Sequence, residues 1–307
     1  MLRYYKLQAG RVVAAEKGEA QVIVLISPEQ EEINALMKDY QIDEHTLSSA
    51  IDSDELARLE YEDEHTVAIY KRPRNYSATD HFQFRIASAG IFMFKDLVII
   101  VSDSELSITD EKKFSKLTSF NMFMLKLINF SITHFYEHLR IINKMTNELE
   151  KKHIYTLEKN EYLIVFGLSK SLVYYMNAIS SNETLLKKLQ MSRSLNFNEA
   201  EQELLDDIII ENTQCKRLTE IYSNVLSSMM SSHGASSDSS ASDDINALKV
   251  LTILTVVIMI PTAVASLFSM NVVYPFDAEN PAVFWIIFIL MIAGTSTFWW
   301  WQNRKKM

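Results

Sequence analysis

The carboxyl-terminal part of the chain contains two long segments that carry no charged side chain. Residues 250–268 and residues 282–301 run for nineteen and twenty residues without Asp, Glu, Lys or Arg. A helix of about 20 apolar residues spans the ~30 Å hydrocarbon layer of a bilayer. The sequence therefore predicts two transmembrane helices, which the short segment 269–281 joins as an antiparallel hairpin.

Charged residues at the ends of these segments predict their orientation. The connecting loop contains Asp277 and Glu279 but no Lys or Arg, whereas Lys249 precedes the first segment and basic residues 304–306 follow the second. Loops on the cytoplasmic side of membrane proteins carry the excess of Lys and Arg. We therefore expect a multi-pass protein of the cell membrane (inner or plasma), with both termini cytoplasmic and a cation-attracting loop, Asp277 and Glu279, outside.

The less apolar residues of the first segment fall on one helical face. They recur at steps of three and four residues, at Thr252, Thr255, Met259, Thr262 and Ser266. One interpretation is a seam between packed membrane helices, where small and hydroxylated residues are enriched. The other is the wall of an ion pore, with Met259 as an apolar narrowing. The spacing alone leaves both interpretations open.

The residues around the end of this segment resemble a known family. The tripeptide Ser269-Met270-Asn271 follows residues 247–252 (Ala-Leu-Lys-Val-Leu-Thr) and 260–262 (Ile-Pro-Thr). This arrangement resembles the CorA family of divalent-cation (magnesium) transporters, whose signature here is Gly-Met-Asn and whose members end in two transmembrane helices and a basic tail. Residues 57–60 and 90–101 are similar to parts of CorA cytoplasmic domains. The chain departs from the family pattern at Ser269 and at Phe268, where the family usually has Tyr.

The resemblance implies a funnel-shaped homopentamer with the first transmembrane helix around a central pore. It assigns the selectivity filter to Ser269, Met270 and Asn271, with a ring of Asn271 amides that binds the hydrated ion. The implied pore lining is Leu248, Leu251, Thr252, Thr255, Met259, Thr262 and Ser266. Leu248, Leu251 and Met259 would then be apolar constrictions that gate by dewetting. The membrane potential would drive uptake, at about 2.3 kcal/mol per charge per 100 mV.

The first hundred residues alternate between strand and helix signals. Strands are expected at residues 3–7, 22–26, 57–62, 66–71, 82–87, 90–94 and 97–101, and helices at 28–40 and 42–54. These elements predict an α/β layer structure with a mixed sheet.

From Thr109 onward the pattern indicates long helices. They are expected at residues 110–155, at 157–191 and from Asn198 onward. Residues 182–184 are a candidate interruption of the second helix. The predicted organisation begins with a cytoplasmic α/β domain at 1–108 and a long-helix stalk at 109–247. The pore-lining first transmembrane helix follows at 248–268, then an extracellular loop at 269–281 and a second transmembrane helix at 282–301. A basic cytoplasmic tail at 302–307 ends the sequence.

Residues 227–244 permit two interpretations. They are mostly Ser, Asp, Gly and Ala, a composition typical of a flexible linker and unfavourable for a helix. The family resemblance implies instead that the third long helix continues through them into the membrane and places Asp238, Asp243 and Asp244 around the mouth of the pore.

Two sets of residues are candidate metal ligands outside the pore. Members of the CorA family sense cytoplasmic Mg²⁺ through carboxylates, and the resemblance offers Asp206, Asp207 and Glu211, or the acidic run Glu60, Glu62, Asp63 and Glu64, although an acidic helix face is more often simply solvated. His134-Phe135-Tyr136-Glu137-His138 fits the H-x-x-E-H pattern of zinc peptidases. Such short patterns arise by chance, and we expect a polar helix face and no enzyme.

Composition agrees with a cation transporter. The net charge of −9 argues against a nucleic-acid partner, and the single cysteine, Cys215, suits a cytoplasmic domain. The leading hypothesis is a CorA-type channel for Mg²⁺ uptake, with Mg²⁺ as transported and regulatory ion, other copies of the chain and the lipid bilayer as partners, and no organic cofactor. Transport of Co²⁺ or Ni²⁺, or of Zn²⁺ as in ZntB, is the alternative on the same fold. A non-conducting membrane-anchored sensor or scaffold is the alternative of another class.

Overall fold

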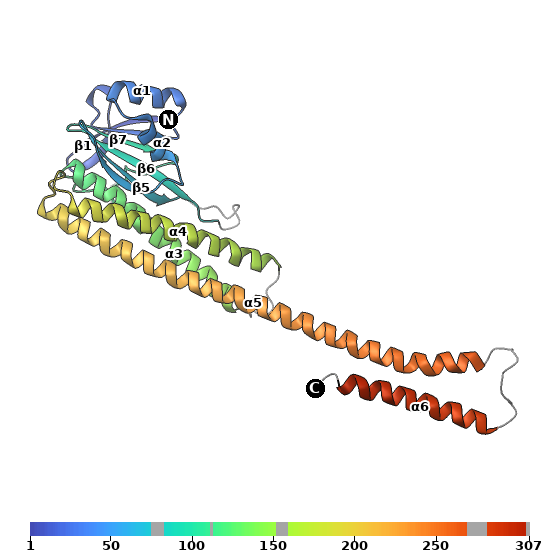
Figure 1. Ribbon diagram of the computed structural model, residues 1–307. Helices are drawn as coiled ribbons and strands as arrows, with labels where there is room; N and C mark the ends of the chain where they lie inside the picture. Colours follow the sequence, from blue (N-terminus) through green and yellow to red (C-terminus); the bar gives the residue numbers. More distant parts are fainter. Residues whose placement is uncertain (75–82, 111–112, 152–158, 269–280, 305–307) are drawn as a thin grey trace. The chain divides into compact units, whose positions relative to one another are not determined.

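A computed structural model of the chain describes residues 1–74, 83–110, 113–151, 159–268 and 281–304 (Figure 1). Its strands are β1 (Leu2–Gln8), β2 (Arg11–Ala14), β3 (Val22–Ile26), β4 (Arg58–Tyr61), β5 (Thr66–Pro73), β6 (Ile86–Met93) and β7 (Val98–Ser102). Its helices are the 3-10 helix η1 (Lys17–Glu19) and the α-helices α1 (Gln30–Tyr40), α2 (Glu44–Ile51), α3 (Phe120–Lys151), α4 (Lys159–Met191), α5 (Glu199–Phe268) and α6 (Pro281–Arg304). The chain divides into two compact units, Met1–His233 and Gly234–Met307.

The first unit is built on one mixed sheet with the strand order β2-β1-β3-β7-β6-β5-β4. Strands β3 and β7 pair in parallel, and the other neighbours pair antiparallel. Every residue of β3 and β7 is buried. Their continuous apolar sequences agree with this position, because central strands covered on both faces need no polar side.

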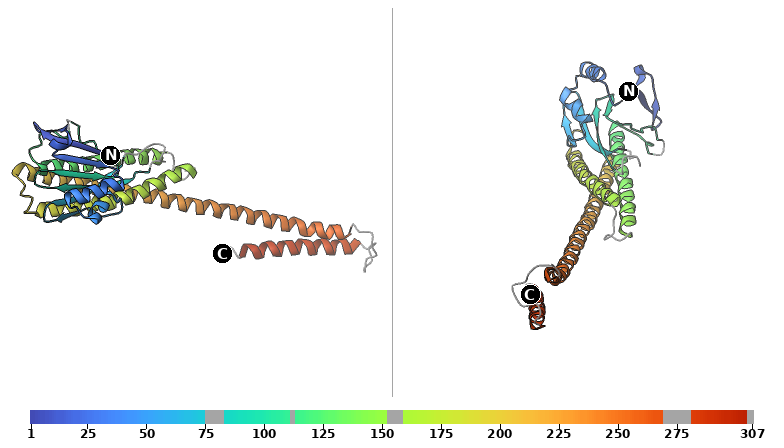
Figure 2. Two further views of the ribbon diagram at one scale, coloured as in Figure 1. Left: turned by 90° about the horizontal axis from the view of Figure 1, so that it is seen from above. Right: turned by 90° about the vertical axis from the view of Figure 1, so that its right-hand side faces the viewer.

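Successive residues of the strands supply two separate cores, since their side chains point to opposite faces of the sheet. Ile23 and Leu25 of β3 join the core under α1 and α2, and Val22 and Val24 join the core shared with the long helices. Figures 1 and 2 show α1 and α2 on one face of the sheet and α3 and α4 on the other. The expected α/β layer structure with a mixed sheet is therefore confirmed.

Close approach of α2 to the sheet depends on Gly90 of β6. A Cβ atom built on Gly90 would lie 2.5 Å from the Cβ of Ala50 in α2, closer than two such atoms can approach. Strand β6 runs without a break through this position, so the expectation of separate strands at 82–87 and 90–94 was wrong. Residues 88 and 89, which the expected strands left out, are buried in the middle of β6. The short strand β2 was not expected.

Helix α3 begins at Phe120, about ten residues after the expected start at Asp110. The hydroxyl of Ser119 accepts a hydrogen bond from the N–H of Met122 at 2.9 Å, which caps the helix. The preceding segment places Leu106, Ile108, Phe114 and Leu117 in the core, and none of its described residues is helical.

Helix α4 continues through residues 182–184, so the interruption considered there is absent. Asn182 is fully buried, and its amide binds the backbone of Lys71 in β5. Helix α5 packs on α3 and α4 in this unit: the Sγ of Cys215 contacts the carbonyl of Ile132 at 3.8 Å, and the amide of Asn212 donates to the carbonyl of Ile179 at 3.1 Å. The long helices expected after Thr109 are confirmed in this form.

Residues 227–244 are helical and belong to α5, in agreement with the family resemblance and not with a linker. The hydroxyls of Ser231 and Ser232 donate to the carbonyls one turn earlier, both at 2.9 Å. Such bonds satisfy serine hydroxyls inside a helix, which composition alone does not reveal. The side chains of Asp238, Asp243 and Asp244 lie outside the described ones.

In the part of the chain that the structure describes, one segment is long and apolar enough to cross a membrane, Glu161–Met191 of α4. This segment contributes Val165, Leu168, Leu172 and Ile179 to the core beneath the sheet. It is therefore a core helix. Two shorter apolar stretches, Leu248–Val264 of α5 and Phe284–Gly294 of α6, lie in the second unit.

Candidate functional site

The seven residues expected to line a pore all lie on α5, in the second compact unit. The filter residues Ser269, Met270 and Asn271 and the loop acids Asp277 and Glu279 lie outside the described residues. The geometry of the candidate site is therefore that of the exposed helix surface between Leu248 and Ser266.

Three threonine hydroxyls of this surface have the same hydrogen-bond pattern. Thr252 donates to the carbonyl of Leu248, Thr255 to that of Leu251, and Thr262 to that of Ile258, each at 2.8 Å. A hydroxyl has one proton to donate and two lone pairs that accept. Since the proton is used within the helix, each of these oxygens can offer only acceptor sites to a ligand.

Four of the expected residues line one hollow on α5. The hollow has a volume of about 510 Å³ and is lined by Thr255, Ile258, Met259, Thr262, Ala263 and Ser266. It brings the thioether of Met259 beside the hydroxyl oxygens of the stripe, as the spacing of three and four residues predicts. The structure therefore places these four residues on one face.

Pro261 lies inside α5. Proline has no N–H, so the carbonyl of Val257, one turn earlier, receives no hydrogen bond from residue 261. Unpaired backbone groups at membrane depth are tolerated where they are buried in protein or face a water-filled cavity. Val257 lies two residues from Thr255 and five from Thr252 and Thr262, so at 3.6 residues per turn its carbonyl is on the opposite side of α5 from the threonine stripe.

Large apolar side chains around this stretch are exposed in the single chain. Leu248, Leu251 and Met259 have exposed fractions of 62%, 59% and 56%. The same is true of α6, where Phe284, Trp285, Ile286, Ile289 and Leu290 are more than half exposed. A helix with apolar side chains on all sides is one that another apolar medium or protein covers.

The candidate regulatory carboxylates lie on the part of α5 that belongs to the first unit. Asp206 accepts a hydrogen bond from the Nε2 of Gln190 at 3.0 Å. Partial burial raises the pKa of the Glu211 carboxyl above its ordinary value, and the neighbouring charge of Asp207 raises it further. Among the described residues no three His, Cys, Asp or Glu side chains are grouped so that they could hold a metal ion.

The H-x-x-E-H residues of α3 make structural contacts. His138 is buried, and its Nδ1 lies 2.6 Å from the hydroxyl of Tyr175 in α4. The imidazole of His134 packs against that of His138, with ring centroids 4.4 Å apart. Burial, and to a smaller extent the nearby His134, lowers the pKa of His138 to about 3. This arrangement is a packed helix contact, so the expectation of a polar helix face was wrong for His138, which is buried between α3 and α4.

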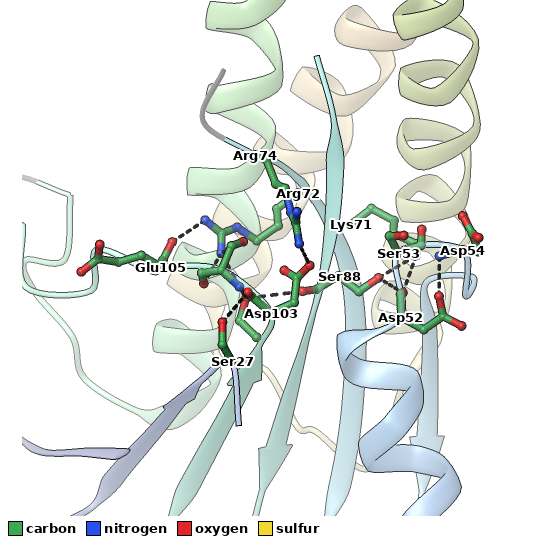
Figure 3. A network of polar contacts seen from close by, with 12 residues as sticks. Ser27, Asp52, Ser53, Asp54, Lys71, Arg72, Arg74, Ser88, Asp103 and Glu105 are labelled. Atoms are coloured by element: carbon green, nitrogen blue, oxygen red, sulfur yellow. Dashed lines mark hydrogen bonds and ion pairs between the residues drawn. The ribbon is translucent and has the colours of Figure 1, made fainter. Parts of the chain in front are cut away.

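A polar network on β5 was not expected from the sequence. The ammonium of Lys71 donates to the hydroxyl of Ser88 at 2.6 Å and to the carbonyl of Ser53 at 3.0 Å. Ser53 lies just after the end of α2. Figure 3 shows Lys71 pointing to the side of Asp52 and Ser53, and Arg72 pointing to the other side, toward Glu105. The basic run at residues 71–74 was the available signal, but its partners are distant in sequence.

Arg72 and Arg74 complete this network. The guanidinium of Arg72 donates to the carbonyl of Glu105 at 2.7 Å and to the hydroxyl of Ser102 at 3.1 Å. Arg74 forms an ion pair with Asp103. Burial lowers the pKa of Lys71, against the raising effect of nearby acidic residues.

Comparison with known proteins connects this chain with cation transporters. The family model of CorA-like Mg²⁺ transporter proteins matches residues 21–304. The cobalt/magnesium transport protein CorA of Methanocaldococcus jannaschii is 24% identical over 274 residues, which cover 86% of this chain and 84% of that protein.

Solved structures share the fold at low sequence identity. The complete structure of the CorA magnesium transporter from Methanocaldococcus jannaschii has a TM-score of 0.72 at 20% identity and covers 99% of this chain and 96% of that one. The full-length CmaX protein has a TM-score of 0.73 at 14% identity, with coverage of 99% and 97%. The ZntB cytoplasmic domain from Vibrio parahaemolyticus has a TM-score of 0.61 at 13% identity, with coverage of 77% and 98%.

Proposed function

The chain belongs to the CorA family of divalent-cation transporters, and on this premise we propose that it conducts hydrated Mg²⁺ into the cytoplasm through a pore lined by α5. Transport, and not enzymatic catalysis, is the activity of this family. The observation that carries the proposal is the row of threonine oxygens on α5 whose protons are bonded to the helix itself.

Acceptor oxygens suit a hydrated cation. Mg²⁺ gives up its water shell reluctantly and usually retains several waters in protein sites. The oxygens of these waters face the ion, so their hydrogens point outward and need acceptors on the wall. Thr252, Thr255 and Thr262 present such acceptors along about three helical turns.

The proposed membrane segments are the last part of α5, residues 248–268, and α6, residues 282–301. The exposed apolar side chains of both helices support this assignment, because water is an unfavourable environment for so much contiguous apolar surface. The charges at the segment ends support cytoplasmic termini and an external loop at 269–281. The membrane potential would then provide about 4.6 kcal/mol per 100 mV for a divalent ion that enters.

One α5 helix cannot enclose a pore, so the proposal includes a homopentamer with α5 around the axis. Asn271 of each subunit would form the ring at the entrance, and Asp277 and Glu279 would raise the local cation concentration. Leu248, Leu251 and Met259 would form the apolar constrictions. Their exposure in the single chain supports a contact with other copies or with the pore lumen.

Flux into proteoliposomes tests the proposal. Thr255→Val keeps the shape of the side chain but removes its oxygen, so Mg²⁺ flux should fall by about tenfold, since every subunit loses one acceptor. Thr297→Val is the matched control, because Thr297 of α6 makes the same type of bond, to the carbonyl of Ala293 at 2.8 Å, and should leave flux unchanged. Equal flux in both variants and the wild type would contradict a pore wall at Thr255.

Asn271→Ala separates the candidate functions. Loss of Mg²⁺ flux in this variant supports the filter assignment. Flux of Co²⁺, Ni²⁺ or Zn²⁺ without Mg²⁺ flux would favour the alternative ions. Two observations are the reason to test them: Ser269 stands in place of Gly, and the fold is similar to that of a ZntB domain. No flux of any divalent cation in the wild type would favour a sensor or scaffold.

Regulation by cytoplasmic Mg²⁺ is a separate part of the proposal. Asp206, Asp207 and Glu211 would bind the ion at a contact with another subunit, and the carboxylate of Asp207 is close enough to Glu211 to add to the effect of burial on its pKa. We expect Mg²⁺ to slow proteolysis of the wild-type protein and to protect the Asp207→Asn variant less. Unchanged protection would exclude these carboxylates as ligands.

A further inference from the structure

A hollow of the first unit lies between the sheet and α4 and has a volume of about 1070 Å³. It is bounded by the segment after α2, by the ends of β5 and β6, and by the first half of α4. Its size is at the upper end of the range for small-molecule sites. None of the residues expected to line the pore contributes to it.

Charge in this hollow is opposite to that of the whole chain. The chain has 30 Lys and Arg against 39 Asp and Glu. The lining of the hollow contains four cationic side chains, Lys71, Arg74, Arg85 and Lys170, and one carboxylate, Asp54. A cationic hollow in an acidic protein attracts anions.

Two of these cations are fixed and two are available. Lys71 is buried and held by Ser88 and Ser53 at the base of the network in Figure 3. Arg74 pairs with Asp103, and its Nε is buried without a hydrogen-bond partner. In the described part of the chain, the exposed head groups of Arg85 and Lys170 form no ion pair with a carboxylate. The fixed cations therefore supply a positive base, and the exposed ones are positioned to bind a ligand.

Aromatic and amide groups lie beside the cations. The Nζ of Lys170 lies 5.9 Å from the ring centroid of Tyr174, and half of the surface of Tyr174 is exposed. Gln83 and Asn177 also line the hollow with exposed side-chain amides. Cations bind phosphate oxygens, a flat ring stacks on a base, and amides bind the edge of a base.

We propose that this hollow binds a nucleoside polyphosphate, with Arg85 and Lys170 on the phosphates and Tyr174 against the base. Binding involves no bond cleavage and does not depend on which ion the pore conducts. The combination of several cations with an exposed ring favours a polyphosphate ester with a base over an inorganic phosphate.

Equilibrium dialysis of the full chain in detergent, with EDTA present, tests the proposal with ATP and with inorganic tripolyphosphate as probes. ATP should bind, and Arg85→Ala and Lys170→Ala should each weaken ATP binding by about tenfold, as expected for the loss of a charge-assisted hydrogen bond. Lys188→Ala is the matched control, because Lys188 is an exposed lysine of the same helix that does not line the hollow. It should leave ATP binding unchanged.

Tyr174→Leu tests the position of the base. It should weaken ATP binding but leave the weaker binding of tripolyphosphate unchanged. The proposal is overturned if ATP does not bind, if the Lys188→Ala variant loses as much affinity as Lys170→Ala, or if tripolyphosphate binds as tightly as ATP. Thermal melting of each variant identifies loss of fold, which the exposed positions of Arg85, Lys170 and Tyr174 should avoid.

Discussion

The side-chain amide of Asn182 in α4 binds both backbone groups of Lys71 in β5. The Oδ1 of Asn182 accepts from the N–H of Lys71 at 2.7 Å, and its Nδ2 donates to the carbonyl of Lys71 at 2.8 Å. Strand β4 pairs with β5 only as far as Ile69. At Lys71, therefore, no strand is hydrogen-bonded to this edge of β5. The amide of Asn182 takes the place of the missing strand and joins α4 to the sheet.

Replacement of Asn182 should therefore destabilise the first unit. Asn182→Leu leaves the buried N–H of Lys71 without a partner, at a cost of about 1–3 kcal/mol. The lower free energy of unfolding is measured by denaturant titration of the full chain in detergent. Asn147→Leu, at an exposed position of α3, is the control and should change stability little. Equal effects in the two variants would contradict the role of the amide.

Gly90→Ala should also lower stability, because its Cβ would overlap the Cβ of Ala50. Either α2 or β6 must shift, and such overpacking costs about 1–3 kcal/mol. Gly18→Ala is the matched control, since no atom lies within 4 Å of the added Cβ. Thermal melting compares the two, and a smaller loss for Gly90→Ala than for Gly18→Ala would show that α2 adapts without strain.

His138 should make the first unit sensitive to acid. Its folded-state pKa is about 3, below the ordinary value of 6.5. Between these values the unfolded chain binds a proton that the folded chain excludes, so stability falls as the pH decreases. The slope from this group approaches about 1.4 kcal/mol per pH unit.

Melting curves between pH 7 and pH 4 check this prediction. His138→Gln should reduce the pH dependence of stability, even if its stability at neutral pH is lower. His45→Gln removes an exposed imidazole and should retain the dependence of the wild type. A slope that is the same in all three proteins would exclude His138 as the acid-sensitive group.

Met259→Ser should increase Mg²⁺ flux severalfold at high cytoplasmic Mg²⁺, where the proposed pore is closed. A serine hydroxyl permits water to remain in a narrowing that a thioether excludes. Met259→Leu preserves the apolar surface and is the control. Fluorescence of an Mg²⁺ indicator inside proteoliposomes measures the flux, and no difference between the Ser and Leu variants would place the constriction elsewhere.

The sheet and the long helices could be expected from sequence because their signals are local. The apolar runs of β3 and β7 and the acidic first turn of α5 indicate their structure without knowledge of the rest. The start of α3 could not be expected. The segment with Ile108 and Phe114 supplies spaced apolar residues to the core, as a helix would, so its sequence alone does not separate it from α3.

The sequence predicted which residues of the candidate site share one helix face, but it did not predict their hydrogen bonds. The spacing of Thr252, Thr255 and Thr262 puts them together, yet only the coordinates reveal that their protons are bonded within α5. The cationic hollow was beyond sequence reasoning, because Arg85 and Lys170 come from elements far apart in the chain. Whether such residues meet is decided by how α4 lies on the sheet.

The bonds of the three threonines to their own helix also fix their side-chain torsions, since a β-branched residue held by such a bond has little rotational freedom. A lining of this kind is preorganised: its oxygens are oriented when the helix forms, before any ion arrives. A passing ion would then meet a rigid set of dipoles and lose little free energy to reorientation of the wall, which favours fast passage over tight retention.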